Sequence, residues 1–300
     1  MIGSKILVLL RRFYSLLKKC FDTALSLIRT LLYSRPGVKY EKLSDFTGTA
    51  FVLGNGPSLK ELIESNEAYL ATQTLIVVND FFLSEKFTSV KPAVYVIADP
   101  LYWEEQVPDN MLDLRLKMQD KLLNQTDWDM LFFVPVNAYK TGVFQRAFMS
   151  NSHIRVLPLN SVPFKGPERL RFFFYDKLLA RPFSDNVIGS ALYITLQMNV
   201  NEIYLFGVEH NWSPNLYVDD QNRTCILTEH FFSKEKQGKV WLKSSGFPYT
   251  IDEALSDVAA MLGGYRELNR YALHKGVKIY NSTPGSFIDV FERRKPENIR

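Results

Sequence analysis

Residues 51–60 read Phe-Val-Leu-Gly-Asn-Gly-Pro-Ser-Leu-Lys, an apolar run that stops at two closely spaced glycines. A short, continuous apolar run is typical of a strand that is buried on both faces of a parallel sheet. Ser58 and Glu61 have the spacing of a capping box, which predicts that a helix begins here. The stretch therefore predicts a strand, a tight glycine turn and a helix, the unit that opens a doubly wound α/β fold.

The rest of the body alternates in the same way between short apolar runs and helical patterns. This alternation predicts an α/β fold with an open, doubly wound, mostly parallel sheet. We expect strands at 50–54, 75–79, 94–98, 131–135, 154–159, 202–207 and 277–280. We expect helices at about 58–70, 101–124, 166–180, 187–199 and 252–275.

Two segments depart from the alternation. Residues 208–250 form a long polar excursion after a predicted strand, and such excursions are usually lids or binding elements. We therefore expect a lid insertion there. The tail after Phe287 becomes strongly charged, so we expect it to be solvated or frayed.

The composition narrows the class of protein. The 300 residues are 46% hydrophobic and 23% charged, which is ordinary for a globular protein and excludes global disorder and rod-like folds. Two cysteines cannot build a disulfide framework, which fits a reduced, cytosol-facing protein. The net charge is +4, but residues 1–35 alone hold seven basic residues and one acidic residue, a charge of +6. The remaining body therefore carries −2, which argues against a nucleic-acid partner.

Residues 1–36 combine this positive charge with apolar residues at helical spacing, from Ile6 to Leu31. Because Arg11 and Arg12 interrupt the apolar run, it is too short to span a membrane and is a poor match to a signal peptide. We expect an amphipathic helix on an anionic membrane surface, followed by a body at 37–300. This predicts a cytoplasmic protein, peripheral on the inner face of the cytoplasmic membrane. The alternative is a helix packed on the body or on a partner subunit.

The glycine turn at 54–58 is the first candidate binding site. Ligands of α/β sheets bind at the carboxyl ends of the strands, and Gly54 and Gly56 permit close approach to the backbone. The N–H groups that begin the helix attract an anion, and the Asn55 amide suits a phosphate or a ribose. The turn matches neither the dinucleotide fingerprint nor the P-loop. The alternative is a well-capped turn without a ligand.

Three segments carry a resemblance to a known family. Residues 54–59, Gly-Asn-Gly-Pro-Ser-Leu, resemble the opening motif of the bacterial family 42 sialyltransferases. Residues 186–209 resemble that family's helix–strand unit, and residues 277–286 are similar to its last strand and proline-containing turn. The opening motif is also similar to that of a wider Rossmann-like group, which includes archaeal pterin pyrophosphokinases. The resemblance implies a Rossmann-like fold of the GT-A-variant type over about residues 37–290.

The resemblance also implies an activity and a set of binding residues. The activity is an inverting, metal-independent transfer from a CMP-activated acidic sugar such as a sialic acid, with no cofactor besides this nucleotide-sugar donor. Asp99 stands where the family has an asparagine, and Glu209 where it has an aspartate, so the match leaves the donor open. Tyr217 has the spacing of the tyrosines that donate to the leaving phosphate. The expected nucleotide-binding residues are Gly54, Asn55, Gly56, Ser58, Asn79, Asp99, Asn186, Glu209 and Tyr217.

The transfer needs a base for the acceptor hydroxyl, and histidine suits this task near neutral pH. The family's lid histidine has no counterpart in residues 244–252. His210 follows the carboxyl end of a predicted strand, and His230 lies in the predicted lid. We expect His230 to be the general base and His210 to bind the phosphate or the acceptor, the alternative for His230 being a packed lid residue. His153 and His274 are expected to be structural.

The leading hypothesis is a membrane-associated glycosyltransferase of surface polysaccharide, capsule or lipopolysaccharide assembly, with a glycan or lipid-linked acceptor. Whether it forms a homo-oligomer stays open. One alternative is a Mg²⁺-dependent small-molecule diphosphokinase or phosphotransferase, in which Asp99 and Asp219-Asp220 hold the metal. Another is a non-catalytic nucleotide-binding subunit of a membrane assembly. Asp127 and Asp129 have the spacing of a metal-binding pair but precede a strand, at the wrong end of the sheet, so we expect no metal site.

Overall fold

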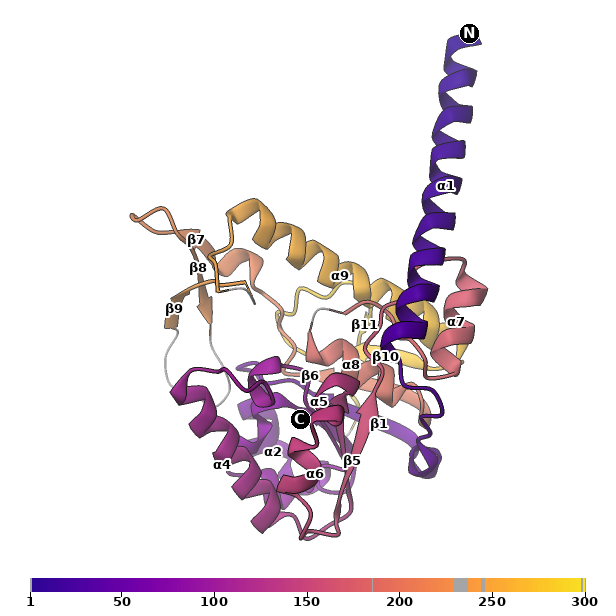
Figure 1. Cartoon of the computed structure of the whole chain (residues 1–300). Helices are drawn as coiled ribbons and strands as arrows, with labels where there is room; N and C mark the ends of the chain where they lie inside the picture. The colour runs from indigo at the N-terminus through magenta and orange to yellow at the C-terminus, as the bar shows by residue number, and fades with distance from the viewer. Residues whose placement is uncertain (1, 185, 229–236, 244–245, 298, 300) are drawn as a thin grey trace.

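A computed structural model describes residues 2–184, 186–228, 237–243, 246–297 and 299. Its centre is an eight-stranded sheet in the order β11-β10-β6-β1-β2-β3-β4-β5, in which every strand pair is parallel (Figure 1). The predicted α/β class with an open, doubly wound sheet is confirmed. The strands are β1 (Thr47–Leu53), β2 (Thr74–Val78), β3 (Val94–Val96), β4 (Met130–Pro135), β5 (Ile154–Leu159), β6 (Asn199–Phe206), β10 (Lys278–Asn281) and β11 (Glu292–Arg293).

The strand order reverses between β1 and β6. From β1 the chain moves outward through β2, β3, β4 and β5, and then returns to add β6 on the other side of β1. β1 and β6 pair along their whole common length, from Thr47 opposite Asn199 to Leu53 opposite Phe206. In sheets of this kind the ligand crevice opens at the carboxyl ends of the strands that flank such a reversal. The crevice is therefore expected where β1 and β6 end.

Successive side chains of the strands point to opposite faces, and each face has its own hydrophobic core. Val52 and Ile76 belong to the core under α7 (Glu168–Asp176), α8 (Val187–Thr195) and α9 (Ile251–His274). Phe51 and Val77 belong to the core under α2 (Leu59–Leu70), α4 (Asp109–Gln125) and α6 (Val143–Ala147). Both faces of the sheet are thus covered, which is why its strands read as continuous apolar runs.

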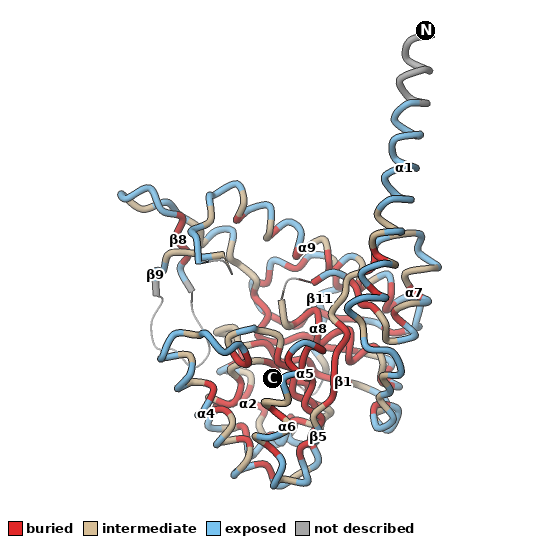
Figure 2. Tube along the Cα trace, viewed as in Figure 1, coloured by how far each residue is buried: buried red, intermediate tan, exposed pale blue. Residues whose placement is uncertain are grey.

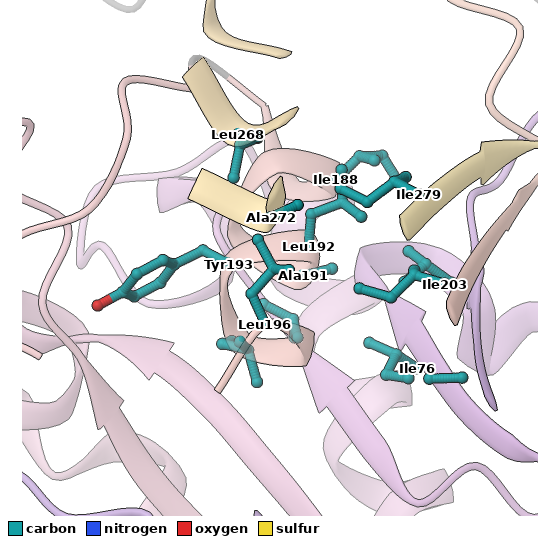
Figure 3. Packing of buried hydrophobic residues seen from close by; sticks show 14 of the residues in the cluster. Ile76, Ile188, Ala191, Leu192, Tyr193, Leu196, Ile203, Leu268, Ala272 and Ile279 are labelled. Atoms are coloured by element: carbon teal, nitrogen blue, oxygen red, sulfur yellow. The ribbon is translucent and has the colours of Figure 1, made fainter. Parts of the chain in front are cut away.

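Helix α8 is buried on all sides, since every residue from Ile188 to Thr195 is buried. Figure 3 shows it between Ile76 and Ile203 of the sheet on one side and Leu268 of α9 on the other. A helix that is apolar all round is stable only in such a place. It also fixes the position of α9 relative to β6, and both elements contribute to the site described below.

The shorter elements were not predicted. The helix expected at 101–124 is divided, because Pro108 precedes α4 and a separate turn covers Pro100–Tyr102. Proline lacks the N–H that a continuous helix would need at that point. The remaining short helices are η1 (Glu41–Asp45), η2 (Asn79–Leu83), α3 (Phe87–Val90), η3 (Pro100–Tyr102), α5 (Val136–Thr141) and η4 (Ser213–Asn215).

The excursion at 208–250 contains a small antiparallel sheet, formed by β7 (Leu216–Val218), β8 (Thr224–Thr228) and β9 (Gln237–Val240). This sheet lies beside the N-terminal end of α9, away from α1 (Figure 1). Its role as a lid stays a prediction, and the segment that contains His230 lies outside the described residues.

The expectation of a frayed tail is wrong. Ile288 and Phe291 are buried, and β11 pairs with β10 in the main sheet. The Arg293 guanidinium donates to the Thr283 carbonyl oxygen (2.7 Å) and to that of Ser286. The buried side chains of Ile288 and Phe291 hold the tail on the body. The sequence pattern did not indicate this, because the charged run at 292–295 dominates it.

Residues Ile2–Tyr33 form the single long helix α1. Its C-terminal part lies beside α7, and toward its N-terminus the helix projects away from the body (Figure 1). Its surface is exposed from Leu10 to Phe21 (Figure 2). Among the described residues, α1 included, no helix combines the length and the apolar character that crossing a bilayer requires.

Two neighbouring glycines of α9 test the packing of this helix. A Cβ atom on Gly264 would lie 2.3 Å from the Phe183 carbonyl oxygen, whereas one on Gly263 would meet nothing closer than the Arg266 guanidinium at 3.5 Å. Gly264→Ala should therefore lower the free energy of unfolding by about 1–3 kcal/mol through overpacking. Gly263→Ala should raise it by about 0.5–1 kcal/mol, because alanine is the better helix former. Urea unfolding of the two variants measures both, and effects of the same sign would contradict this packing.

Candidate functional site

The turn after β1 crosses directly over the end of β6. The Gly54 N–H donates to the Phe206 carbonyl oxygen (2.8 Å), and the Gly56 N–H donates to that of Gly207 (2.8 Å). A Cβ atom on Gly54 would lie 2.3 Å from the Gly207 oxygen, so only glycine fits there. Neither Gly54 nor Gly56 has a positive φ. The two glycines are thus required by contact between two protein segments, whatever ligand the edge holds.

The crossing carries Glu209 to the N-terminus of α2. The Ser58 N–H donates to Glu209 Oε1 at 2.9 Å, and the carboxylate is buried. A Cβ atom on Gly56 would fall 1.5 Å from Glu209 Oε2. The carboxylate therefore occupies the place beside the helix start where we expected an anionic ligand, and it meets the positive end of the helix dipole there.

The predicted capping box at this helix is wrong. Ser58 has helical backbone angles and its side chain makes no capping hydrogen bond. Because Glu209 already accepts from the Ser58 N–H, the helix start is satisfied from the neighbouring strand end. A capping box does form at α9, between Thr250 and Glu253.

Asn55 and Asn79 join the ends of three strands. Asn55 Nδ2 donates to the Val78 carbonyl oxygen at the end of β2 (3.1 Å), and Asn79 Oδ1 accepts from the Ala98 N–H beyond β3 (3.3 Å). Asn79 has a φ of 39°, a left-handed conformation that asparagine adopts more readily than most residues. Among the described residues, the buried Oδ1 of Asn55 has no hydrogen-bond partner.

Asp99 lies one residue beyond this junction. Its carboxylate accepts from the Leu101 N–H at 3.0 Å and so caps η3. The side chain is half-buried. The structure thus gives Asp99 a structural task at the same edge of the sheet, and any contact with a ligand stays a prediction.

His210 follows Glu209 and is held in an uncommon conformation. Its φ is 46°, in the left-handed region that a non-glycine residue rarely adopts without a functional or structural reason. The imidazole stacks on Trp212 with 4.7 Å between the ring centres. Its Nδ1 lies 3.3 Å from the Tyr265 hydroxyl of α9. Burial lowers the pKa of His210 to about 3, so the imidazole is neutral at physiological pH.

A chain of hydrogen bonds determines which nitrogen of His210 carries the proton. The Gly189 N–H donates to Asn186 Oδ1 (2.9 Å), which identifies that atom as the amide oxygen. The Tyr265 hydroxyl lies 3.1 Å from the same oxygen and must donate to it. Tyr265 can then only accept from His210, so Nδ1 carries the hydrogen and Nε2 keeps a lone pair. The site therefore offers a neutral, oriented acceptor.

Eight of the expected binding residues, with His210, lie along one continuous edge that joins the ends of β1, β2, β3 and β6 to the starts of α2 and α8. Tyr217 is outside this group: it lies in β7 opposite Cys225, and no hydrogen bond or ring contact among the described residues connects it to the edge. Burial and Cys225 raise the pKa of the Tyr217 hydroxyl. The roles of all these residues in binding stay predictions.

The other acidic residues and histidines that the sequence singled out are paired elsewhere. Asp129 contacts Lys42 and His153 at the amino end of β4, and Asp127 contacts Lys91. Asp219 pairs with Arg223, which lowers the pKa of that carboxyl to about 2. His274 packs on Phe172. Within the described part of the chain, no group of three or more histidine, cysteine, aspartate or glutamate side chains could hold a metal ion.

The sequence did not indicate a role for Tyr265 or Trp212, and both of these residues contact the His210 ring. Tyr265 lies on the buried stripe of α9, where an aromatic residue is indistinguishable from ordinary core packing. Tyr265 and His210 are 55 positions apart in the sequence, and only the fold brings them into contact. Trp212 is two residues from His210, and its proximity to a strand end was the one available indication.

A cavity of about 80 Å³ lies at the reversal point on the α2 side, lined by Ser58, Gly207, Ser282, Pro284 and Lys295 among others. Pockets for drug-sized ligands usually measure about 300–1,000 Å³. This cavity is therefore too small for a nucleotide.

Among solved structures, the chain is similar to a glycosyltransferase. It is the MAf glycosyltransferase from Magnetospirillum magneticum AMB-1, with a TM-score of 0.48 and 14% sequence identity. The match covers 89% of this chain but 36% of the other, so the chain spans only about a third of that protein's length. No protein-family model matches the sequence, and no curated protein does.

The capping role of Glu209 predicts a graded response to substitution. Glu209→Ala leaves the Ser58 N–H without its partner and should cost about 1–3 kcal/mol of unfolding free energy. Glu209→Gln keeps an oxygen for that bond and should cost less, about 1 kcal/mol or under, for the lost charge at the helix start. Glu61→Ala is the control: since no capping box forms, it should change stability by no more than about 0.5 kcal/mol. Urea unfolding would contradict the assignment if Glu61→Ala proved the more damaging change.

Burial of His210 predicts loss of stability in acid. The unfolded chain binds a proton at this histidine below about pH 6.5, whereas the folded chain does so only near pH 3. The free energy of unfolding should therefore decrease as the pH falls from about 6.5 toward 3, by up to about 2 kcal/mol at pH 5 from this group. His210→Gln should remove that part of the decrease, and His274→Gln should not. Urea unfolding at pH 7 and pH 5 provides the comparison, and parallel profiles for wild type and His210→Gln would refute it.

Proposed function

We propose that this protein is an inverting glycosyltransferase that uses a nucleotide-activated sugar, with a CMP-linked acidic sugar as the first candidate. Like the family 42 sialyltransferases that residues 54–59 resemble, it would need no metal ion. It would act at the inner face of the cytoplasmic membrane on a glycan or lipid-linked acceptor, in the assembly of a surface polysaccharide, capsule or lipopolysaccharide. The observation that carries the proposal is the neutral, tautomer-fixed His210 at the point where the strand order reverses.

His210 suits the acceptor side of this reaction better than the phosphate side. In an inverting transfer, the acceptor hydroxyl attacks the anomeric carbon from the face opposite the nucleotide while a base removes its proton. The Nε2 lone pair of His210 can accept a hydrogen bond from that hydroxyl. It cannot donate to a phosphate oxygen, because the hydrogen is on Nδ1. We therefore assign His210 to the acceptor rather than to the phosphate.

The low pKa of His210 makes its basicity dependent on the donor. Burial disfavours the imidazolium, so the ligand-free site does not hold a proton there at neutral pH. A nucleotide phosphate nearby brings negative charge, which stabilises the imidazolium as the transfer proceeds. His210 would thus become an effective base only when the donor is bound. His230, which lies outside the described residues, remains the other candidate for the base.

The nucleotide would bind along the row formed by Asn55, Asn79 and Glu209. Three buried polar atoms at this edge have no hydrogen-bond partner within the described residues: Asn55 Oδ1, Asn186 Nδ2 and Glu209 Oε2. A buried polar atom without a partner costs about 1–3 kcal/mol, and such atoms are often kept where function requires them. Ribose hydroxyls and a phosphate offer the donors and acceptors that these atoms lack. The Asn55 amide nitrogen already donates to backbone and the Asn79 amide oxygen already accepts from it, so we expect these two residues to shape the edge as well as to contact the ligand.

Thermal unfolding with CMP, UDP, GDP and ATP, each with and without Mg²⁺, tests the choice of nucleotide. A ligand at about a hundred times its Kd should add roughly 2.7 kcal/mol to the unfolding free energy. We expect CMP to stabilise the protein without Mg²⁺. Stabilisation by ATP with Mg²⁺ alone would favour the kinase alternative, and no stabilisation by any nucleotide would overturn the proposal.

Substitution of the two histidines tests the chemistry. With a CMP-sugar and an acceptor glycan, His210→Gln should lower kcat for nucleotide release by about 10²-fold or more and leave the stabilisation by CMP nearly unchanged. His230→Gln distinguishes the two candidate bases in the same assay, and His274→Gln is the matched control. Full activity in both the His210 and His230 variants would exclude these two histidines as the base, whereas stabilisation of the wild type by a nucleotide without any nucleotide release would favour a non-catalytic nucleotide-binding subunit.

A further inference from the structure

Helix α1 is attached to the body by its hydroxyl-bearing face. Ser26 and Thr30 are each only 4% exposed. Ser26 Oγ accepts from the Lys165 N–H (2.9 Å), and Ser34 Oγ donates to the Leu179 carbonyl oxygen (2.5 Å). The Arg35 N–H just after the helix donates to Asn160 Oδ1 at 2.7 Å. These contacts hold the last turns of α1 in one orientation.

The opposite face of α1 is apolar and has no partner among the described residues. Its members recur three and four positions apart, at about 100° per residue, and lie roughly opposite Ser26 and Thr30. Leu31 is 82% exposed although it belongs to the attached turns. We call this face the apolar stripe; it consists of Leu10, Phe13, Tyr14, Leu17, Phe21, Ile28, Leu31 and Leu32. From end to end it is about 33 Å long, at 1.5 Å per residue.

The charges beside the apolar stripe are basic. Arg11, Lys18 and Arg29 fall on one side of it, and Asp22 is the one acidic residue between positions 10 and 33. Monomeric soluble proteins rarely leave a continuous apolar surface of this size uncovered. A surface that is both apolar and anionic would complement the stripe and its basic border.

We infer that the apolar stripe lies flat in the surface of an anionic membrane, with the body held on the opposite side of the helix. The inference rests on the membrane association in the proposed function and adds which face of α1 makes the contact. Because Ile28 and Leu31 belong to the attached turns and still face outward, the body does not cover the stripe there. A flat surface can therefore contact the stripe along its whole length without detachment of α1.

A second copy of the chain is a poorer partner for this face. Leu10, Tyr14, Leu17, Phe21 and Ile28 also have the spacing of a coiled-coil seam. In such a pair, Arg11 and Lys18 would flank the seam, where cations usually form salt bridges with acidic residues of the partner helix. The positions of the partner helix that would face them hold Phe13 and Cys20, which are not acidic. The stripe is also wider than a seam, since Phe13 and Leu32 are exposed beside it.

The attachment also relates the membrane to the crevice. The Asn160 side chain accepts from the Arg35 N–H and donates to the Arg35 carbonyl oxygen. Asn160 directly follows the carboxyl end of β5. The Arg35 guanidinium lies 4.9 Å from the ring centre of Tyr139, in the helix that follows β4. Helix α1 is therefore fixed at the carboxyl edge of the sheet, the edge that also holds Asn55, Glu209 and His210. A lipid-linked acceptor would approach the crevice from the membrane side.

Vesicle co-sedimentation of the full chain tests the contact. We expect binding to vesicles of phosphatidylglycerol and phosphatidylcholine, and much weaker binding to phosphatidylcholine alone. Leu10→Ser/Leu17→Ser should weaken binding at least tenfold, and Arg11→Gln/Lys18→Gln roughly thirtyfold on the anionic vesicles. The control is Leu112→Ser/Leu116→Ser, which removes two exposed leucines from α4 and should change nothing. Equal binding by the stripe variant and the control would overturn the inference.

Tryptophan placed in the stripe tests its orientation. In chains with Phe13→Trp or Leu31→Trp, brominated lipids should quench the added fluorescence to a similar extent, because both ends of a flat stripe lie at one depth. Quenching of the first alone would refute the flat arrangement. A chain that is dimeric without lipid, becomes monomeric with Leu10→Ser/Leu17→Ser, and does not bind vesicles would identify a second copy as the partner instead.

The two proposals fail separately in these assays. Nucleotide release to a soluble acceptor should survive Leu10→Ser/Leu17→Ser, and vesicle binding should survive His210→Gln. A wild-type chain that releases nucleotide but does not bind anionic vesicles would count against the membrane inference alone. A wild-type chain that binds anionic vesicles but releases no nucleotide with any donor would count against the glycosyltransferase proposal alone.

Discussion

The site depends on one close crossing of two backbone segments, the turn after β1 and the end of β6. Gly54 and Gly207 approach so closely there that a Cβ atom on Gly54 would overlap the Gly207 carbonyl oxygen. The approach allows the two hydrogen bonds from Gly54 and Gly56 to form, and these extend the pairing of β1 and β6 beyond the strands themselves. Glu209 reaches the start of α2 because of this extension, and His210 follows it into the crevice. A wider turn would separate all of these groups.

The crossing also explains why the charge at this edge is arranged as it is. The first turn of α2 has N–H groups that attract an anion, and the protein supplies one from its own chain as Glu209. The neighbouring His210 is neutral, and its Nδ1 hydrogen is directed to the Tyr265 hydroxyl. The direction of this bond is set by Asn186, whose oxygen accepts from both the Gly189 N–H and Tyr265. The edge thus has a fixed anion and a fixed acceptor before any ligand arrives. In the proposed transfer, preorganised groups of this kind would lower the reorganisation that the reaction requires.

Much of the fold was predictable because the strands are buried on both faces and therefore read as apolar runs. Asn55, Asn79, Asp99, Glu209 and His210 were also identifiable, since each follows a predicted strand and the carboxyl ends of parallel strands meet at one edge. The capping of α2 was not, because Glu209 lies 151 positions from Ser58 and only the paired sheet brings them together. Local spacing favoured Glu61, which is nearer in the chain but makes no cap. Tyr265 was missed for the same reason, as its spacing on α9 is that of a core residue.

The attachment of α1 gives the basic segment a more specific meaning than its charge alone. A helix that was only an amphipathic anchor would be expected to bury its apolar face against whatever apolar surface lay nearest, the body included. In α1 the body covers Ser26, Thr30 and part of Leu27, and of these Ser26 accepts a hydrogen bond from the Lys165 N–H. This attachment leaves the more hydrophobic face of α1 exposed. Exposed apolar surface is unfavourable in water, so the arrangement is favourable only if another apolar phase covers that face. Since the attachment is at the carboxyl edge of the sheet, a membrane that covers that face would bring the lipid surface to the edge that holds His210 and its neighbours.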